Sequence, residues 1–422
     1  MSSFSKEERV AFEDILEGFD DQLVLSRNVA KYNTDQRMME RANDTIWRPM
    51  PYIATTFEGA DQTANFQNNT QLSVPAQINR RRVHPWIMTD LELRDALQEQ
   101  RLGEAAKQRL ASDINVAIMN VAAAQGSLVV KRTVAASGFD DVAQCDAIMN
   151  EQGVPSYDRF LALSTRDYNG MASNLQVASR SFNGGKSDTA YERAFVGPVA
   201  SFNTYKLDYA NRLAAAAGGG GLTVSTLAAA GNYWVPKATS TATTGETSNV
   251  DNRFQRITIS STTNVAAGDC FTIAGVNAVH HITKGDTGNL KTFRVISVDS
   301  ATTMTISPPI ISNQGGSDAE AQYQNVVVTP SATAAIVFLN TVSAFVNPFW
   351  QKDALEILPG RIATPSDAGV AVMRGTTDNG FELVMQKFVD INTGNIKYRM
   401  DTLFGVVCKN PEMAGLVLFS QS

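Results

Sequence analysis

Apolar residues near the start of the chain recur at helical spacing. Between residues 6 and 30 they are Phe12, Ile15, Leu16, Phe19, Leu23 and Leu25, interrupted by Gly18. This spacing predicts an amphipathic arm of one or two helices. The other side of the arm carries acidic residues, namely Glu7, Glu8, Glu13, Asp14, Glu17, Asp20 and Asp21. A stripe of one charge is usually a solvated face, and docking of a basic partner on Glu13, Asp14 and Glu17 is the alternative.

The next segment lacks helical periodicity. Residues 43–57 hold aromatic and β-branched residues between turn formers, which predicts short strands. Residues 58–79 are rich in Gln, Asn, Thr and Gly and predict a long exposed loop, and loops of that length usually have a function. Arg80, Arg81 and Arg82 follow it. They either pair with carboxylates of a neighbouring molecule or form a solvated basic patch.

A capping box predicts the start of a long helix, because Thr89 and Glu92 have the spacing at which each satisfies the other's backbone donor. The apolar stripe of that helix is Leu102, Ala106, Leu110, Ile114, Ile118 and Ala122. Gly126 supplies the stop after Gln125. Gly103 is expected inside the helix, where it costs about 1 kcal/mol relative to Ala, and it is either tolerated or a bend point.

Residues 140–217 mix helical patterns with strand patterns and predict an α+β layer. The helical patterns are residues 141–151 and 187–195, and the strand pattern is residues 160–163. The four glycines 218–221 then mark a sharp change in composition.

Residues 223–330 are dense in Thr, Ser and Val and show no convincing helical period. The strand-like runs are residues 255–262, 270–274, 290–298, 304–307 and 325–329. Their spacing predicts a small antiparallel barrel or sandwich. Beyond Pro330 the mixed pattern returns, with a predicted helix at 332–345 and strands at 380–389, 396–407 and 416–419. The chain is therefore predicted to be an α+β protein with an inserted β domain.

The bulk numbers narrow the function. With 422 residues, two or three domains are expected. A net charge of -6, from 36 basic and 42 acidic residues, gives no general reason to bind nucleic acid. The three cysteines, Cys145, Cys270 and Cys408, are expected to be small buried residues in a reducing compartment. The first ten residues show no signal core, and no run of about eighteen apolar residues is present.

Catalytic and metal-binding patterns are weak. Residues 184–187 match the end of a phosphate-binding loop, but Arg180 stands where the first glycine is required. His280 and His281 lie near Cys270, yet consecutive side chains on a strand point to opposite faces and rarely share one zinc ion. We therefore expect no enzyme activity, no cofactor and no metal site.

Several motifs, in their order along the chain, are similar to a known family. They are Asn43-Asp44-Thr45-Ile46-Trp47-Arg48-Pro49, Gln125-Gly126-Ser127-Leu128-Val129, Val250-Asp251-Asn252-Arg253-Phe254, Gly268-Asp269, Ile273-Ala274-Gly275-Val276, Phe404-Gly405-Val406 and Asn410-Pro411-Glu412. They resemble segments of the major capsid (coat) proteins of P22-like tailed bacteriophages, which have the HK97-like capsid fold. The likeness runs discontinuously from end to end, and its most specific part is the inserted domain.

The resemblance implies a division of the chain. The expected parts are an N-terminal arm (1–42), early strands and an extended loop (43–88), the spine helix of the peripheral domain (89–131), a first peripheral and axial part (132–222), the inserted β-barrel domain (223–330) and a second axial and peripheral part (331–422). Relatives that cross-link their shells use a lysine in the extended loop. Residues 57–82 contain none, so a non-covalent shell is expected.

The resemblance also implies partners. The chain would form pentamers and hexamers of a closed shell with a separate scaffolding protein and a portal protein. It would enclose double-stranded DNA without sequence specificity, in a virion assembled in the host bacterial cytoplasm and without a membrane. Lys284 and Asp286, in the polar stretch 284–289, resemble a loop that reaches across subunits, with a plain hairpin loop as the alternative. Gly103 is the candidate bend for shell expansion.

A β-rich virion binding module, such as a decoration or tail protein, is the rival interpretation of the Thr- and Ser-dense middle. The long capped helix argues against it. A hydrolase is the third and weakest candidate.

Overall fold

The computed structural model describes residues 4–32, 45–50, 53, 56, 58–63, 66, 69–89, 91–94, 103–179, 197–207, 209–218, 220–225, 234–363 and 370–422. They belong to two compact units. Unit 1 comprises Met1–Ile46, Ala76–Met119 and Glu356–Val407, and unit 2 comprises Trp47–Pro75, Asn120–Leu355 and Cys408–Ser422. One of the predicted helical stretches, 187–195, lies outside the described residues.

Unit 1 begins with the amphipathic helix predicted between residues 6 and 30, and this helix is confirmed. This part of the chain consists of α1 (Lys6–Gln22), a 3₁₀ turn η1 (Ser26–Asn28) and β1 (Ala30–Lys31). Phe12, Ile15 and Phe19 are buried, as the helical spacing requires. Ser5 and Glu8 form a capping box at the start of α1, with Ser5 N donating to Glu8 Oε2 at 2.7 Å.

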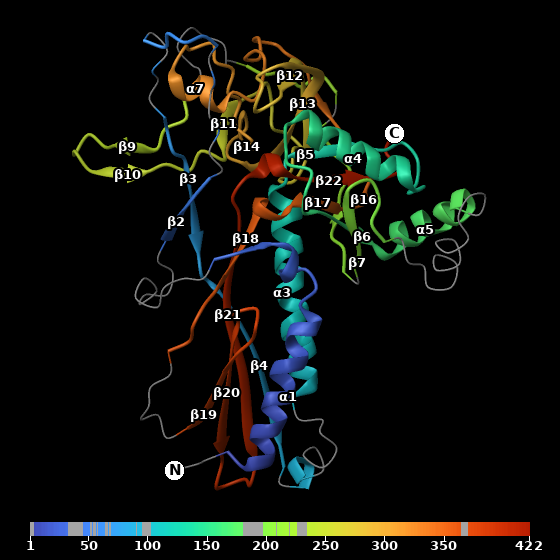
Figure 1. The fold of residues 1–422 in the computed structure, drawn as a ribbon, viewed down its shortest axis with the longest axis vertical. Helices are drawn as coiled ribbons and strands as arrows, with labels where there is room; N and C mark the ends of the chain where they lie inside the picture. The colour runs from blue at the N-terminus through green and yellow to red at the C-terminus, as the bar shows by residue number, and fades with distance from the viewer. Residues whose placement is uncertain are drawn as a thin grey trace. The chain divides into compact units, whose positions relative to one another are not determined.

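The main sheet of unit 1 has the order β1-β18-β21-β20-β19, and β4 pairs with β21 (Figure 1). The strands are β4 (Arg80–Met88), β18 (Leu355–Pro359), β19 (Ala371–Thr376), β20 (Glu382–Val389) and β21 (Ile396–Cys408). The predicted strands 380–389 and 396–407 are thus confirmed. Helix α1 lies close to β19, since a Cβ on Gly375 would come within 3.0 Å of Phe12 Cε1.

The predicted long helix is confirmed over α3 (Glu104–Gln125), and it ends at Gln125 as expected. The capping box is present, with Thr89 N donating to Glu92 Oε2 at 2.9 Å before the helical residues 91–94, but it is not the start of α3, which begins at Glu104. The prediction that Gly103 lies inside the helix is wrong. Gly103 has φ +77°, a left-handed conformation that interrupts a right-handed helix, and α3 begins immediately after it.

The predicted loop at 58–79 is wrong in its last part. Residues 73–77 form β3 (Ser73–Gln77), which pairs with β2 (Thr45–Pro49). Leu72, Val74, Ala76 and Ile78 are buried while the residues between them are not, which is the period of two of a half-buried strand. The small and polar residues of this stretch hid that alternation. The early strand predicted within 43–57 is confirmed by β2.

The central sheet of unit 2 has the order β5-β22-β17-β6-β7. Its strands are β5 (Leu128–Lys131), β6 (Arg159–Ser164), β7 (Phe202–Leu207), β17 (Asn347–Gln351) and β22 (Ala414–Leu418). Helices α4 (Phe139–Glu151) and α5 (Thr165–Ser179) accompany it, and short elements β8 (Arg212–Leu213), β16 (Ala344–Phe345), η3 (Lys352–Ala354) and η4 (Pro411–Met413) complete the layer. The helix predicted at 141–151 and the strands predicted at 160–163 and 416–419 are confirmed. No described helix is long and apolar enough to cross a membrane.

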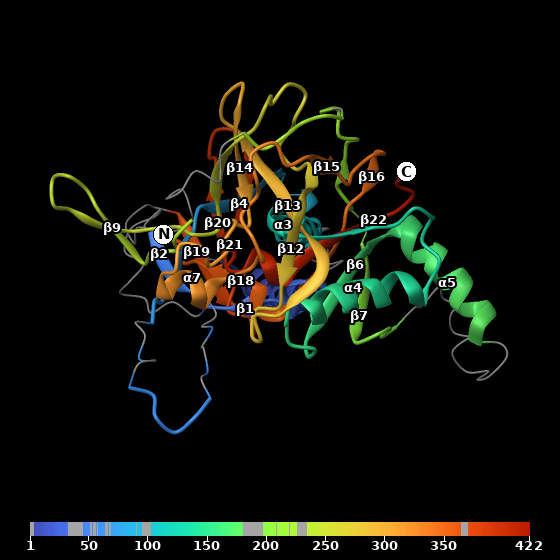
Figure 2. The same cartoon turned by 90° about the horizontal axis from the view of Figure 1, so that it is seen from above.

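The β-rich middle of the chain forms a closed antiparallel barrel within unit 2 (Figure 2). Its sheet has the order β11-β14-β13-β12-β15. The strands are β11 (Gln255–Thr258), β12 (Cys270–Val279), β13 (Asp286–Val298), β14 (Thr303–Ser307) and β15 (Ile336–Phe338). Residues 222–225 close the sheet, because Thr223 pairs with Ala335 next to β15 and Val224 pairs with Ile259 next to β11. Its core is apolar and includes Phe271, Phe293 and Ile306.

Four of the five strands predicted in this region are confirmed. The fifth, at 325–329, is wrong: it forms no strand beyond one bridge between Val326 and Ala278, and a short helix α7 (Asp318–Tyr323) precedes it. The helix predicted at 332–345 is also wrong. Exposure alternates from Thr333 to Val337, and Ile336 enters the barrel as part of β15. The alanines suggested a helix, but alternating burial of the neighbouring side chains favours a strand.

Candidate functional site

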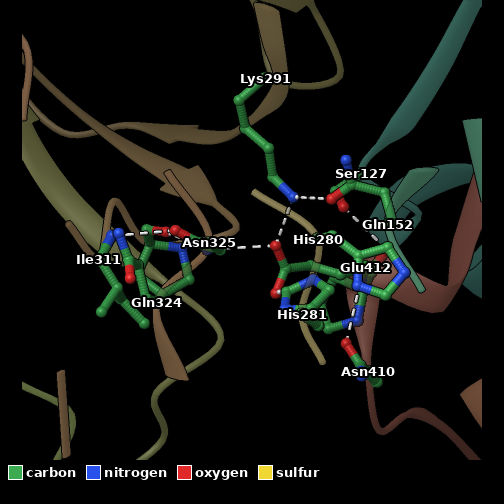
Figure 3. A network of polar contacts seen from close by, with 12 residues as sticks. Ser127, Gln152, His280, His281, Lys291, Ile311, Gln324, Asn325, Asn410 and Glu412 are labelled. Atoms are coloured by element: carbon green, nitrogen blue, oxygen red, sulfur yellow. Dashed lines mark hydrogen bonds and ion pairs between the residues drawn. The ribbon is translucent and has the colours of Figure 1, made fainter. Parts of the chain in front are cut away.

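A buried polar cluster lies where the barrel meets the central sheet and α4 in unit 2 (Figure 3). We call it the Glu412 cluster, and its members are Gln152, His281, Lys291, Asn325, Asn410 and Glu412. They come from five parts of the chain: the end of α4, the turn after β12, strand β13, the segment after α7, and η4. Sequence analysis did not identify this cluster.

Glu412 is the hub of the cluster. Lys291 Nζ lies 2.6 Å from Glu412 Oε1, and Asn325 Nδ2 donates to the same oxygen at 3.1 Å. His281 Nε2 lies 3.5 Å from Glu412 Oε2 and forms an ion pair only when the ring is protonated. Lys291 Nζ also donates to Gln152 Oε1 at 2.7 Å. One carboxylate therefore links the barrel to the end of α4 and to the segment that enters β22.

Burial governs the electrostatics of this cluster. Burial alone raises the pKa of Glu412, but the charge of Lys291, together with the contact to His281, outweighs it and holds that pKa far below its ordinary value of 4.5. The Lys291 side chain is only 1% exposed. Because each charge of a buried pair depends on the other, loss of either partner leaves an uncompensated buried charge.

Unit 1 also has a buried carboxylate, that of Glu8, at the start of α1. The acidic stripe of α1 was predicted as one solvated or docking face, and for Glu8 this is wrong. Lys387 Nζ donates to Glu8 Oε1 at 2.7 Å, and the Tyr398 hydroxyl donates to the same oxygen. Burial raises the pKa of Glu8, but these hydrogen bonds together lower it below 4.5. Glu8 thus fastens α1 to β20 and β21.

The docking candidates of α1 remain accessible. Glu13, Asp14 and Glu17 are all exposed, on the side of the helix away from Ile15 and Phe19. Their role in docking stays a prediction.

The three arginines predicted in an exposed loop lie in strand β4 instead. Arg80, Arg81 and Arg82 face Phe404, Leu403 and Thr402 of β21 in the antiparallel register. Arg81 forms an ion pair with the buried carboxylate of Asp401 in the same chain. The strand that the three arginines begin continues to Met88. Their pairing with another subunit stays a prediction, with Arg82 the more exposed candidate beside Arg80.

The polar stretch 284–289 is not one loop. Asp286 starts β13 and pairs with Val279, so the turn itself is residues 280–285. Lys284 turns inward: its Nζ donates to the Gln322 carbonyl at 2.8 Å, at the end of α7, and burial lowers the pKa of Lys284 to about 8. For an intersubunit contact, Lys284 Nζ would have to break its hydrogen bonds to the carbonyls of Gln322 and Gln324. Asp286 is exposed and accepts a hydrogen bond from Gly288 N at 2.8 Å.

The histidines and cysteines have structural surroundings. His280 and His281 lie in the turn after β12 rather than on a strand. The expectation that they point to opposite faces of a strand therefore does not apply to them. His280 Nδ1 accepts from Thr283 N at 3.2 Å. All three cysteines are free and buried, as predicted, and burial raises the pKa of Cys408 to about 12. Among the described residues no group of three metal-ligating side chains is assembled.

A projecting hairpin was also missed. Strands β9 (Thr239–Thr241) and β10 (Thr247–Asn249) pair only with each other, and all six residues are exposed (Figures 1 and 2). Its Thr and Ser residues, with a turn at Gly245, are typical of a hairpin, so this element could have been predicted from the sequence.

The sequence profile of the family described as "P22 coat protein - gene protein 5" matches residues 1–420. The chain therefore belongs to the P22 coat protein family, and its role is in a bacteriophage capsid shell. The family resemblance inferred from the sequence motifs is thereby confirmed.

Solved structures with similar chains include phage particles. The capsid structure of the cyanophage P-SCSP1u is 12% identical, with a TM-score of 0.44, over 94% of this chain and 87% of that chain. A structure from Mycobacterium phage Che8 is 8% identical, with a TM-score of 0.45, over 94% of this chain and 92% of that one. The CUS-3 coat protein I-domain is 41% identical over 28% of this chain and 96% of that chain, with a TM-score of 0.22.

Proposed function

We propose that the chain is the major capsid protein that self-assembles, with a separate scaffolding protein, into the icosahedral shell around the double-stranded DNA of a tailed phage. The observation that carries the proposal is the family match along residues 1–420. In this proposal the fold is the HK97-like capsid fold, with α1 as part of the N-terminal arm and α3 as the spine helix. The barrel formed by residues 222–338 is the inserted domain.

Contacts between copies are the first requirement of a shell. The β9–β10 hairpin is a suitable contact, because an isolated two-stranded hairpin is marginally stable in water and gains from pairing with another surface. All six of its strand residues are free to make such a contact. Many weak contacts of this kind sum to a stable shell. The absence of lysine from residues 57–82 supports a shell without covalent cross-links.

Scaffolding protein is the second requirement. The exposed carboxylates Glu13, Asp14 and Glu17 suit a basic segment of such a partner, while the buried Glu8 keeps α1 on its sheet. Asp14→Asn is expected to weaken incorporation of scaffolding protein without unfolding the chain. Asp378→Asn, an exposed carboxylate in the turn between β19 and β20, is the matched control. Equal scaffold content in both sets of particles would remove α1 as the docking site.

The direct test is co-expression of the chain with the scaffolding protein of the same phage, followed by sedimentation and negative-stain microscopy. Closed shells that contain this chain support the proposal. A small oligomer of fixed size under all conditions would instead favour a decoration or tail protein. The portal protein and packaged DNA enter the same proposal as later partners of the shell.

A further inference from the structure

Arg294, in the middle of β13, is a buried cation. Its residue is 2% exposed, and it stands opposite Cys270 in the barrel sheet. No carboxylate forms an ion pair with it in the part of the chain that the structure describes. The nearby Asp269 makes no ion pair with Arg294 among the described residues; its two oxygens accept from Asn340 Nδ2 at 2.9 Å and from Ala266 N at 2.9 Å. A buried charge without a partner is rare, because desolvation costs several kcal/mol.

The guanidinium is instead directed at the end of α3. Arg294 Nη1 donates to the Ala123 carbonyl at 2.6 Å and lies 3.4 Å from the Gly126 carbonyl. Two residues earlier in β13, Thr292 Oγ1 donates to the Ser127 carbonyl at 2.8 Å. One strand of the barrel therefore contacts three carbonyls, those of Ala123, Gly126 and Ser127, at and just beyond the end of the helix.

The last turn of α3 needs such donors. The final four carbonyls of a helix lack partners within the helix and carry a partial negative charge of about half an electron. Helix α3 has no basic residue in its last turn to meet that charge. The Ala122 carbonyl accepts a hydrogen bond from Gly126 N at 3.0 Å, whereas the Ala123 carbonyl accepts one from Arg294 Nη1.

We infer that Arg294 is the C-terminal cap of α3, and that the carbonyl end of the helix is the counter-charge that allows this arginine to be buried. The cap comes from a residue 171 positions away in sequence, so it forms only when β13 is folded against the end of α3. This part of α3, from Asn120, belongs to unit 2 together with the barrel. The inference concerns the folded chain itself and holds whatever the chain assembles into.

Lys291 provides a contrast on the same strand. It is as deeply buried as Arg294, but its partners are the Glu412 carboxylate and Gln152 rather than the end of α3. Removal of either cation disturbs the barrel surface. Only removal of Arg294 is expected to release the helix end.

The test is hydrogen exchange of the purified full-length chain, followed by mass spectrometry, for Arg294→Met, Arg294→Lys and the control Lys291→Met. In Arg294→Met the amides of residues 119–126 are expected to exchange about tenfold to thirtyfold faster, while residues 270–279 and 303–307 of the barrel keep their protection. Arg294→Lys retains the charge and is expected to show a smaller increase in the same segment. Lys291→Met destabilises unit 2 as a whole, so it is expected to accelerate exchange of residues 119–126 no more than exchange of the barrel strands at 270–279 and 303–307.

Unchanged exchange of residues 119–126 in Arg294→Met would overturn the inference. Loss of protection that begins in the barrel strands would overturn it as well, because Arg294 would then be a packing residue of the barrel. If Arg294→Met does not fold, Arg294→Lys decides alone: acceleration confined to residues 119–126 supports the cap, and acceleration elsewhere or nowhere contradicts it.

Discussion

Removal of Lys291 is expected to destabilise unit 2 strongly. The change Lys291→Met preserves much of the length of the side chain but removes the charge that faces Glu412 at 2.6 Å. Glu412 would then keep only Asn325 and His281 as partners, and Gln152 Oε1 would lose its donor. The reciprocal change, Glu412→Gln, leaves the Lys291 ammonium buried without a carboxylate.

The magnitude follows from burial. Breaking a buried ion pair by removing one partner costs about 3–5 kcal/mol. The Lys291 side chain is 1% exposed and the Glu412 side chain is 15% exposed, so water reaches the carboxylate but not the ammonium. Because the stranded carboxylate is partly hydrated, we expect Lys291→Met to cost about 3 kcal/mol, the lower limit of this range. The double variant Lys291→Met with Glu412→Gln leaves neither charge buried without its partner. We expect it to cost about as much as one single change rather than their sum, since contacting residues are not additive.

Unfolding in urea measures this if unit 2 is observed separately. The chain has four tryptophans, and only Trp86 lies in unit 1. In a Trp86→Phe background the fluorescence therefore comes from Trp47, Trp234 and Trp350 of unit 2. The urea midpoint of each variant, with an unchanged slope, then gives the loss of free energy of unfolding.

The control is an exposed cation of unit 2. Arg256 Nε lies 3.4 Å from Asp299 Oδ2 and the Arg256 side chain is 63% exposed, so Arg256→Met is expected to cost less than about 1 kcal/mol. If Lys291→Met costs no more than this control, or if the two single changes add up in the double variant, the assignment of Glu412 as the hub of the junction is refuted.

Three further predictions follow. The lowered pKa values of Glu8 and Glu412 add stability that is complete above their ordinary value of 4.5 and is lost as the pH falls towards the folded-state values. The melting temperature should therefore be constant from about pH 8 to 6 and fall below about pH 4.5. The fall should be less steep in Glu8→Gln than in the wild-type chain, and an equal fall in the two would contradict this. Gly415→Ala places a Cβ within 2.4 Å of the Leu128 carbonyl and should cost about 1–3 kcal/mol of unfolding free energy or more. Gly394→Ala meets no neighbouring atom and strains only its own backbone, with φ +67°, so it should cost about 1 kcal/mol, and a larger loss there than at Gly415 would be against the packing argument. Replacing residues 239–249 by a short Gly-Ser linker should leave the melting temperature unchanged but reduce the yield of shells, and normal yields would exclude the hairpin as a contact.

The sequence predicted those elements whose periodicity is carried by large side chains. Helix α4, strand β21 and four barrel strands are found where their apolar residues recur with the right period. Strand β3 was missed because Ser, Pro, Ala and Gln alternate with less contrast. The stretch 332–345 was assigned to a helix from its alanines, although closure of the barrel decided its structure.

Most of the Glu412 cluster could not have been predicted from the sequence. Lys291 and Glu412 lie far apart in sequence, and neither has a local motif that identifies its partner. Arg294 likewise looks like an ordinary residue of a strand, and only the folded chain brings it to the end of α3. By contrast, the exposure of Glu13, Asp14 and Glu17 follows from the period of α1 alone, since their neighbours Phe12 and Ile15 must be buried.

The central claim is that this chain builds a closed shell. Electron cryo-microscopy of particles from cells that co-express the chain with its scaffolding protein tests it most directly. We expect icosahedral shells whose density accommodates both units of the chain in every subunit, with the β9–β10 hairpin against a neighbouring copy. Particles that lack the chain in the shell layer, or a chain found only as an open oligomer bound to other virion parts, would contradict it.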